Sequence, residues 1–167
     1  LSSSSAASDV YKRQDLNRFQ KLYNTFIKNF IKYEFELDEI IYQKIPTFRV
    51  HLKDNQAVGE WHRDRDYNHG KSEVNIWLPF TDAYDTNTIW IESEEDKNDF
   101  KPYNVSYGEV LVFNGANLIH GNKTNIEHDT RVSVDFRIVN PTEFIPSTKG
   151  SINTNTSFDI GGYFQKL

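Results

Sequence analysis

The chain has 167 residues, of which 37% are hydrophobic and 14% aromatic, values typical of one globular domain and not of a disordered chain. Its net charge of −5 argues against a general nucleic-acid binder, and no apolar run is long enough to span a bilayer. The absence of Cys excludes disulfides and thiolate metal sites. We therefore expect a cytoplasmic protein with no nucleic-acid, membrane or obligate protein partner.

The first residues differ in composition from the rest of the chain. Residues 1–8 consist of Leu, Ser and Ala, and they lack the long apolar core of a signal peptide. The chain also contains no Met. We therefore expect a fragment in which residues 1–14 are a non-native or disordered leader. Residues 15–167 are expected to form a single domain with a β core at about 45–140.

An amphipathic helix is predicted from Asp15 to Phe35, with Asp15 as a candidate N-cap. The apolar residues that recur at helical spacing are Leu16, Phe19, Tyr23, Phe26, Ile27, Phe30 and Ile31. Core packing is the natural role of such a stripe. We expect the helix to cover the outside of a sheet.

The remainder of the chain is typical of short strands separated by polar turns. The predicted strands are Thr47–Leu52, Glu73–Phe80, Thr88–Ile91, Glu109–Phe113, Leu118–His120 and Thr130–Val139. The tail after Pro141 is rich in Ser, Thr, Asn and Gly, and we expect it to be mostly loop, with residues 161–164 docking an aromatic pair. This pattern predicts a mainly β sandwich, jelly roll or barrel.

His62, Asp64 and His120 form the pattern of a metal site. Residues two apart on an extended backbone point the same way, so His62 and Asp64 can reach one ion, and His120 follows after about three predicted strands. Two imidazoles and one carboxylate suit Fe(II) and leave coordination positions open. The alternative is that His62 and Asp64 are solvated charges in a loop. His69 and His128 lie in polar loops and receive no role.

Arg131 and Ser133 favour the metal hypothesis. A guanidinium binds a carboxylate through two parallel donors, and Ser133 shares the same face of its predicted strand. An inward-facing Arg131 would therefore grip a carboxylate beside the metal, and Ser133 would donate a hydrogen bond to it. The alternative is a solvent-facing strand with ordinary ion pairs, and we apply this interpretation to Asp135 and Arg137.

Further residues are candidates for contact with a co-substrate or a substrate. Asn75 and Trp77 share one face of a predicted strand, where Asn75 would bind a co-substrate and Trp77 either walls the pocket or packs in the core. Asn122 follows the second His by two residues and either orients the co-substrate or forms a turn. Arg49 and His51 are candidates to meet the substrate, with surface or structural roles as the alternative.

This ordered set of motifs resembles the Fe(II)/2-oxoglutarate-dependent oxygenases, which carry His-x-Asp, a distal His and then Arg-x-Ser. The corresponding residues are His62-Arg63-Asp64, His120 and Arg131-Val132-Ser133. The flanking sequence is similar to the phytanoyl-CoA-dioxygenase-like branch, and within it to small oxygenases of streptomycin-type and carbohydrate-cluster biosynthesis. The stretches that carry this likeness are 48–52, 60–64, 75–80, 87–92 and 118–122, within roughly residues 45–140.

The resemblance implies a double-stranded β-helix, which is a jelly-roll or cupin-like fold, with the iron at its open mouth. It implies that the metal ligands and catalytic residues are His62, Asp64 and His120. It implies that the residues that bind 2-oxoglutarate are Arg131, Ser133, Asn75 and Asn122.

The implied activity is that of a dioxygenase that uses Fe(II), 2-oxoglutarate and O2 to hydroxylate or oxidise a small polar metabolite, with a sugar-derived compound as the expected class. Relatives halogenate when a small residue replaces the carboxylate ligand, so Asp64 predicts hydroxylation or oxidation. One alternative is a non-catalytic cupin-like module that binds a metal or a sugar, and another is an inactive truncated fragment. Arg131 and Ser133 favour the enzyme, because a non-catalytic jelly roll needs no carboxylate clamp beside its metal.

Overall fold

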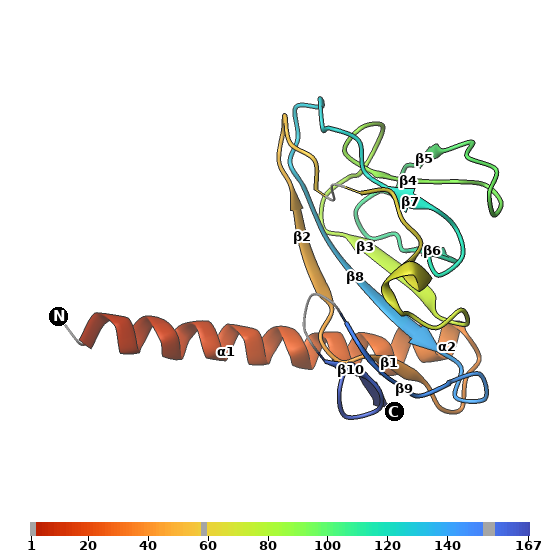
Figure 1. The fold of residues 1–167 in the computed structure, drawn as a ribbon. Coiled ribbons are helices and arrows are strands. Elements are labelled where there is room, and N and C mark those ends of the chain that lie inside the picture. Colours follow the sequence, from red (N-terminus) through yellow and green to blue (C-terminus); the bar gives the residue numbers. More distant parts are fainter. Residues whose placement is uncertain (1–2, 58–59, 152–155) are drawn as a thin grey trace. The chain divides into compact units, whose positions relative to one another are not determined.

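The computed structural model describes residues 3–57, 60–151 and 156–167 (Figure 1). These residues divide into two compact units, and each is described by itself. The first unit extends to Ile40 and includes Leu167, and the second spans Ile41–Lys166. In the part of the chain that the structure describes, no helix has both the length and the apolar character needed to cross a membrane.

The first unit is helical. It consists of α1 (Ser3–Phe26), a π-helical turn η1 (Ile27–Ile31) and the short α2 (Lys32–Glu34). The predicted helix is therefore confirmed in kind, but its predicted start is wrong. Helix α1 begins at Ser3, so Asp15 lies inside the helix and is not its N-cap.

Part of the predicted apolar stripe in the first unit is buried. Tyr23, Ile27 and Ile31 follow one another at four-residue spacing and are at most 5% exposed, as expected for one face of a helix. Leu16 and Phe30 belong to the same predicted stripe but are 67% and 43% exposed. The stripe that is buried is therefore narrower than the sequence pattern suggested. Packing of this helix on the outside of the sheet stays a prediction.

The second unit is mainly β, as predicted. Its elements are β1 (Ile41–Gln43), β2 (Thr47–His51), a 3-10 turn η2 (Asp64–Tyr67), β3 (Val74–Pro79), β4 (Ile89–Ile91), β5 (Lys101–Tyr103), β6 (Leu111–Phe113), β7 (His120–Gly121), β8 (Arg131–Val139), β9 (Ser147–Gly150), β10 (Ser157–Phe158) and β11 (Phe164–Lys166). All strand pairs between these elements are antiparallel.

Strand β8 is the centre of the larger sheet, whose order is β11-β1-β8-β3-β6 (Figure 1). Along one edge β8 pairs first with β2 and then, at its end, with β1, while β3 pairs along the other edge. The alternation of polar and apolar residues from Arg131 to Ile138 accounts for its two faces. Almost every residue of β8 is buried, so both faces of this strand are covered.

A smaller sheet with the order β5-β4-β7 lies apart from the larger one in Figure 1. Between the two sheets packs a cluster of buried apolar side chains contributed by β3, β4 and neighbouring loops. Its members are Trp77, Ala83, Ile89, Ile91 and Val105. Since these residues come from both sheets, their burial favours the arrangement in which the sheets face each other.

The tail after Pro141 is mostly loop and turn in its described residues, as predicted. It also contains short strands that the sequence did not predict: β9 pairs with β10, and β11 extends the larger sheet beyond β1. The expected docking of an aromatic pair is confirmed, since the rings of Tyr163 and Phe164 lie 4.9 and 6.4 Å from that of Phe158. Strands of two or three residues show too little alternation to be recognised.

Replacement of Ile91 by Ala tests the apolar cluster between the sheets. Ile91 is 1% exposed, and we expect Ile91→Ala to lower the free energy of unfolding by about 2–5 kcal/mol, because the removed atoms leave a cavity. Urea unfolding measures the change. Val112→Ala is the matched control, since Val112 is 47% exposed and its truncation should cost less than about 0.5 kcal/mol. Equal losses in both variants would contradict this packing.

Candidate metal centre

His62 and His120 are directly paired across two segments of chain. The backbone N–H of each donates to the carbonyl of the other, at 3.1 and 3.0 Å, in an isolated antiparallel bridge. Opposed residues of an antiparallel pair place their side chains on the same side. The two rings accordingly lie with centroids 4.7 Å apart, and β7 supplies His120 from the smaller sheet.

Asp64 completes the group from the start of η2. The backbone at Arg63 is extended, with φ −103° and ψ 141°, which turns Asp64 to the same side as His62. Asp64 itself begins a 3-10 turn, so the expected regular strand is absent at this residue, although the predicted juxtaposition occurs. Its N–H donates to Gly115 O at 2.9 Å, which attaches the turn to the loop before β7.

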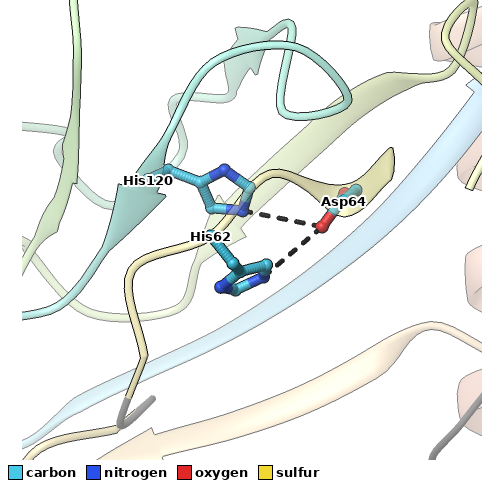
Figure 2. Close-up of side chains that lie close together, drawn as sticks. All are labelled: His62, Asp64 and His120. Carbon is cyan, nitrogen blue, oxygen red and sulfur yellow. Dashed lines mark ion pairs between the residues drawn. The ribbon is translucent and has the colours of Figure 1, made fainter. Parts of the chain in front are cut away.

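The three side chains converge on one point (Figure 2). The Nε2 atoms of His62 and His120 lie 3.5 and 3.7 Å from Asp64 Oδ1, and the three ligand atoms all lie within 4.8 Å of one another. Asp64 is 2% exposed and His120 6% exposed. A close group of two imidazole nitrogens and one carboxylate oxygen is the donor set of a divalent transition-metal site.

Each histidine presents the nitrogen that a metal requires. Nδ1 of His62 lies 2.9 Å from Glu60 O, and Nδ1 of His120 lies 3.0 Å from Leu118 O. A carbonyl can only accept, so both Nδ1 atoms carry the proton and both Nε2 atoms keep a lone pair. Such an outer hydrogen bond fixes the tautomer and the orientation of a ligating histidine. These residues therefore fit a metal ion.

The second oxygen of Asp64 is fully occupied by donors from the larger sheet. Oδ2 accepts from Asn75 Nδ2 at 2.7 Å and from Arg137 Nε at 3.0 Å, and Arg137 Nη2 lies 2.9 Å away. Only Oδ1 is thus left for a metal. The approach of Asn75 requires a glycine at residue 115, because a Cβ there would lie 2.6 Å from Asn75 Nδ2.

The prediction of surface ion pairs for Asp135 and Arg137 is wrong. Both side chains are buried, at 6% exposure each, and Arg137 binds Asp64 as described above. Asp135 bridges two arginines, accepting from Arg49 Nε at 2.5 Å and from Arg137 Nη1 at 3.3 Å. The physical reason is that buried charge is costly unless it is paired, and these charges are paired with one another inside the protein.

Electrostatics favour the protonation state that a metal needs at Asp64 and His120, whereas His62 must lose a proton that its contact with Asp64 stabilises. Burial acts to raise the pKa of Asp64, but the positive charge of Arg137 and the His62 hydrogen bond lower it well below its ordinary value. Burial lowers the pKa of His120, and the nearby Asp64 charge opposes this only in part. Burial also acts to lower the pKa of His62, but its contact with Asp64 outweighs burial and raises it.

A narrow cavity of about 40 Å³ connects the candidate ligands with Arg131. Among its lining residues are His62, His120 and Arg131. Arg131 is 1% exposed, and its three hydrogen bonds go to neutral acceptors: Asn87 O at 3.0 Å, Ser133 Oγ at 2.5 Å and His51 Nδ1 at 3.3 Å.

Among the described residues no carboxylate forms an ion pair with Arg131. The nearest candidate, Asp135, has one oxygen bound to Arg49 and the other to Arg137. Burial lowers the pKa of Arg131 to about 10, and the positive charge of Arg49 adds to this effect. A buried guanidinium in such surroundings is an attractive site for an anion.

The other predicted contact residues fall into different positions. Asn75, Trp77, Asn122 and Arg49 line the narrow cavity, and the ring centroid of Trp77 lies 5.2 Å from Arg131 Cζ. Asn122 donates to Thr88 O at 3.0 Å. Ser133 holds Arg131 and is fully buried.

His51 lines neither the narrow cavity nor the wider cavity that opens beside His62 and Asp64. It is fully buried, with Nε2 donating to Asn55 O at 2.9 Å and Nδ1 accepting from Arg131. Its contact with substrate stays a prediction that this position does not favour.

A second, wider cavity of about 650 Å³ opens beside His62 and Asp64. Most of its other walls come from β1, from the start of β2 and from the tail, through residues such as Gln43, Thr47, Arg49 and Tyr163. We call it the outer cavity. Its volume is in the range of small-molecule sites.

Sequence reasoning missed two residues of the outer cavity. His69 was assigned no role, yet its Nδ1 lies 2.6 Å from the buried carboxylate of Glu73. Tyr163 contributes its ring to the wall, and burial raises the pKa of its hydroxyl to about 12. A polar loop and a Gly-rich tail carry no periodic signal that would have predicted either position.

Two solved structures are similar to this chain. The crystal structure of AviO1 from Streptomyces viridochromogenes Tue57 matches with a TM-score of 0.50 and 19% identity, covering 68% of this chain and 57% of that chain. A structure described as a non-heme monooxygenase, the ThoJ–Ni complex, matches with a TM-score of 0.49 and 14% identity, covering 70% of this chain and 54% of that chain. The likeness to AviO1 extends to the fold alone.

A closer relationship is found in sequence. The chain is 47% identical over 132 residues to the streptomycin biosynthesis protein StrG of Streptomyces griseus, and the match covers 79% of this chain and 63% of StrG. The chain is therefore a homologue of StrG that spans less than two thirds of the length of that relative. No protein-family model matches the chain.

Replacement of Asp64 tests the buried pair with Arg137 in metal-free protein. Because folding lowers the pKa of Asp64, its ionised form contributes stability above the unfolded-state pKa of about 3.9 and loses it as the pH falls through the folded-state pKa. We expect Asp64→Asn to lower the free energy of unfolding at pH 7 by about 3 kcal/mol, and this deficit to shrink below about pH 4.

Urea unfolding over a series of pH values measures the deficit. The exposed Asp54 supplies the control, because Asp54→Asn makes the same chemical change beside a basic residue without breaking a buried pair. A deficit for Asp64→Asn that is the same at pH 3 and pH 7 would contradict the lowered pKa.

Proposed function

We propose that this protein is a non-haem Fe(II)- and 2-oxoglutarate-dependent oxygenase. The observation that carries the proposal is the buried Arg131, which has no carboxylate partner among the described residues and lines the same narrow cavity as His62 and His120. A metal site alone has no need of such a group. A dicarboxylate that binds the metal at one end and Arg131 at the other would neutralise the buried charge.

His62, Asp64 and His120 would hold the iron through Nε2, Oδ1 and Nε2. Iron with 2-oxoglutarate and O2 supplies the oxidising power for insertion of oxygen into a C–H bond. The side chains of the protein bind and orient. Arg137 and Asn75 keep Asp64 anionic and leave only its Oδ1 for the metal. Ser133 and Asn87 hold Arg131 in place.

The fold that we propose in finer detail is a double-stranded β-helix. In support of it, the larger and the smaller sheet are both antiparallel, they share an apolar cluster, and the candidate ligands lie between them. The N-terminal helix would cover the outside of such a barrel. Placement of the iron at its open mouth agrees with the position of the outer cavity beside His62 and Asp64.

The substrate that we propose is a small polar metabolite, with a sugar-derived compound as its class. Hydroxyl, amide and charged side chains predominate in the outer cavity, including those of Gln43, Thr47, Glu60 and Tyr67. Such groups pair with the hydroxyls of a polyol. The homology with StrG, a streptomycin biosynthesis protein, supports the same class. A screen for compounds that accelerate succinate release above the substrate-free rate would identify it.

A non-catalytic module that binds a metal or a sugar is the second candidate. The observation that favours it is the polar outer cavity, which requires no turnover to bind a polyol. The two candidates differ in one prediction. The enzyme converts 2-oxoglutarate to succinate in the presence of Fe(II) and O2, whereas the module does not.

The metal and co-substrate sites are tested together by the visible charge-transfer band that Fe(II) and 2-oxoglutarate form under anaerobic conditions. We expect the band in the wild-type protein and its loss in Asp64→Ala, which lacks the carboxylate ligand. Arg131→Met should retain the band but require at least about 30-fold more 2-oxoglutarate, because loss of a buried charge pair costs about 2 kcal/mol or more.

Arg65→Met is the matched control for this titration. Arg65 binds Glu95 and Asn117 and lines neither the narrow nor the outer cavity, so its loss should leave the 2-oxoglutarate requirement unchanged. A folded wild-type protein that binds iron but shows no band at any 2-oxoglutarate concentration would refute the oxygenase proposal. The binding module would then be the better description.

A further inference from the structure

Arg63 lies between two candidate ligands in sequence and is anchored away from them in space. Its extended backbone directs its side chain to the side opposite that of His62 and Asp64. There Nε donates to Asn117 O at 2.9 Å, and Nη2 lies 3.4 Å from Glu92 Oε1 and also forms an ion pair with Asp96. The side chains of Arg63 and Glu92 are 13% and 0% exposed, so their contact is shielded from water, whereas Asp96 is 76% exposed.

Glu92 is the buried anion behind the site. It is 0% exposed, and its carboxylate accepts from Ile119 N at 2.6 Å and from Asn98 N at 3.2 Å. Its own N–H donates to Ile119 O at 3.0 Å. Burial acts to raise the pKa of Glu92, but the two backbone donors and Arg63 outweigh burial and lower it. Glu92 is thus an ionised side chain fixed to the residue that precedes His120.

Together these contacts join the two segments that carry the candidate ligands. Asn117 and Ile119 belong to the segment that ends at His120, and Arg63 contacts the first directly and the second through Glu92. This connection adds to the backbone pair between His62 and His120. Since the three ligand atoms must stay within a few ångströms of one another, a small shift of either segment changes their spacing.

We propose that Arg63 and Glu92 form a positioning pair that sets the spacing of His62, Asp64 and His120, and thereby the affinity and geometry of the metal centre. The pair acts through these ligands and does not touch the metal. The inference rests on the proposed metal site, and its test separates the two.

Titration of the metal-free full chain with Co(II) tests the pair without any substrate. The dissociation constant and the ligand-field absorption spectrum of bound Co(II) are the readouts. We expect Arg63→Met and Glu92→Gln each to weaken Co(II) binding by about 10–100-fold, the usual effect of groups that orient metal ligands, and to alter the spectrum. The double variant should bind no more weakly than the weaker single variant, because the two residues act as a unit.

Arg65→Met is the matched control, two residues along the same segment. Arg65 contacts Asn117 and pairs with the more exposed Glu95, and it does not lie between the ligands. Its Co(II) affinity should stay within about twofold of wild type. Arg63→Lys keeps the charge but lacks the planar fork, so it should fall between wild type and Arg63→Met. Thermal unfolding of each metal-free variant establishes that it is folded.

The outcomes are distinct. Wild-type affinity and spectrum in folded Arg63→Met and Glu92→Gln would overturn the positioning role while leaving the metal site intact. An equal loss in Arg65→Met would overturn it as well, because any arginine of this segment would then have the same effect. Failure of wild-type protein to bind Co(II) would instead refute the metal site, and with it the proposed function.

Discussion

The carboxylate of Asp64 joins the candidate metal centre to both sheets of the second unit. Its Oδ2 accepts from Asn75 on β3 and from Arg137 on β8, so the larger sheet holds it. Its Oδ1 faces the Nε2 atoms of the two histidines, one of which β7 supplies from the smaller sheet. Burying a carboxylate costs free energy unless its oxygens accept hydrogen bonds, and here the donors are side chains of the central strands β3 and β8. The distance between the sheets and the spacing of the ligands are therefore coupled through one side chain.

The inner face of β8 shows how the charges around this site are apportioned. Arg137 is compensated by Asp64 and by Asp135, and Asp135 is shared with Arg49. Arg131 lies on the same face of β8, four residues before Asp135. After these pairings its hydrogen bonds go only to neutral acceptors among the described residues. Placing four ionic side chains on a covered sheet costs free energy unless the set is balanced. The imbalance at Arg131 is the feature of this network that supports the proposed anion site.

The candidate ligands could be predicted from the sequence, because spacing on an extended backbone reports on side-chain direction, although only His120 lies in a strand. The helix start could not, since residues 3–14 continue the helix without an apolar stripe to mark it. The role of Arg137 was missed because alternation separates two faces of a strand but does not say which face meets water. The pairing of Arg63 with Glu92 joins residues 29 positions apart and leaves no trace in local pattern. Tertiary contacts decide both cases.

The division of the site between structural elements also explains what can vary independently. Ligand spacing depends on cross-links between the sheets, such as those made by Asp64 and by Arg63. The outer cavity is instead walled largely by β1, by the turn into β2 and by the tail, and two of these wall residues, Gln43 and Tyr163, contact Arg137. Changes in walls other than these two can alter the shape of the cavity without breaking a contact of Arg137. A rigid metal centre and a variable outer cavity can therefore coexist, because they depend on different parts of the second unit.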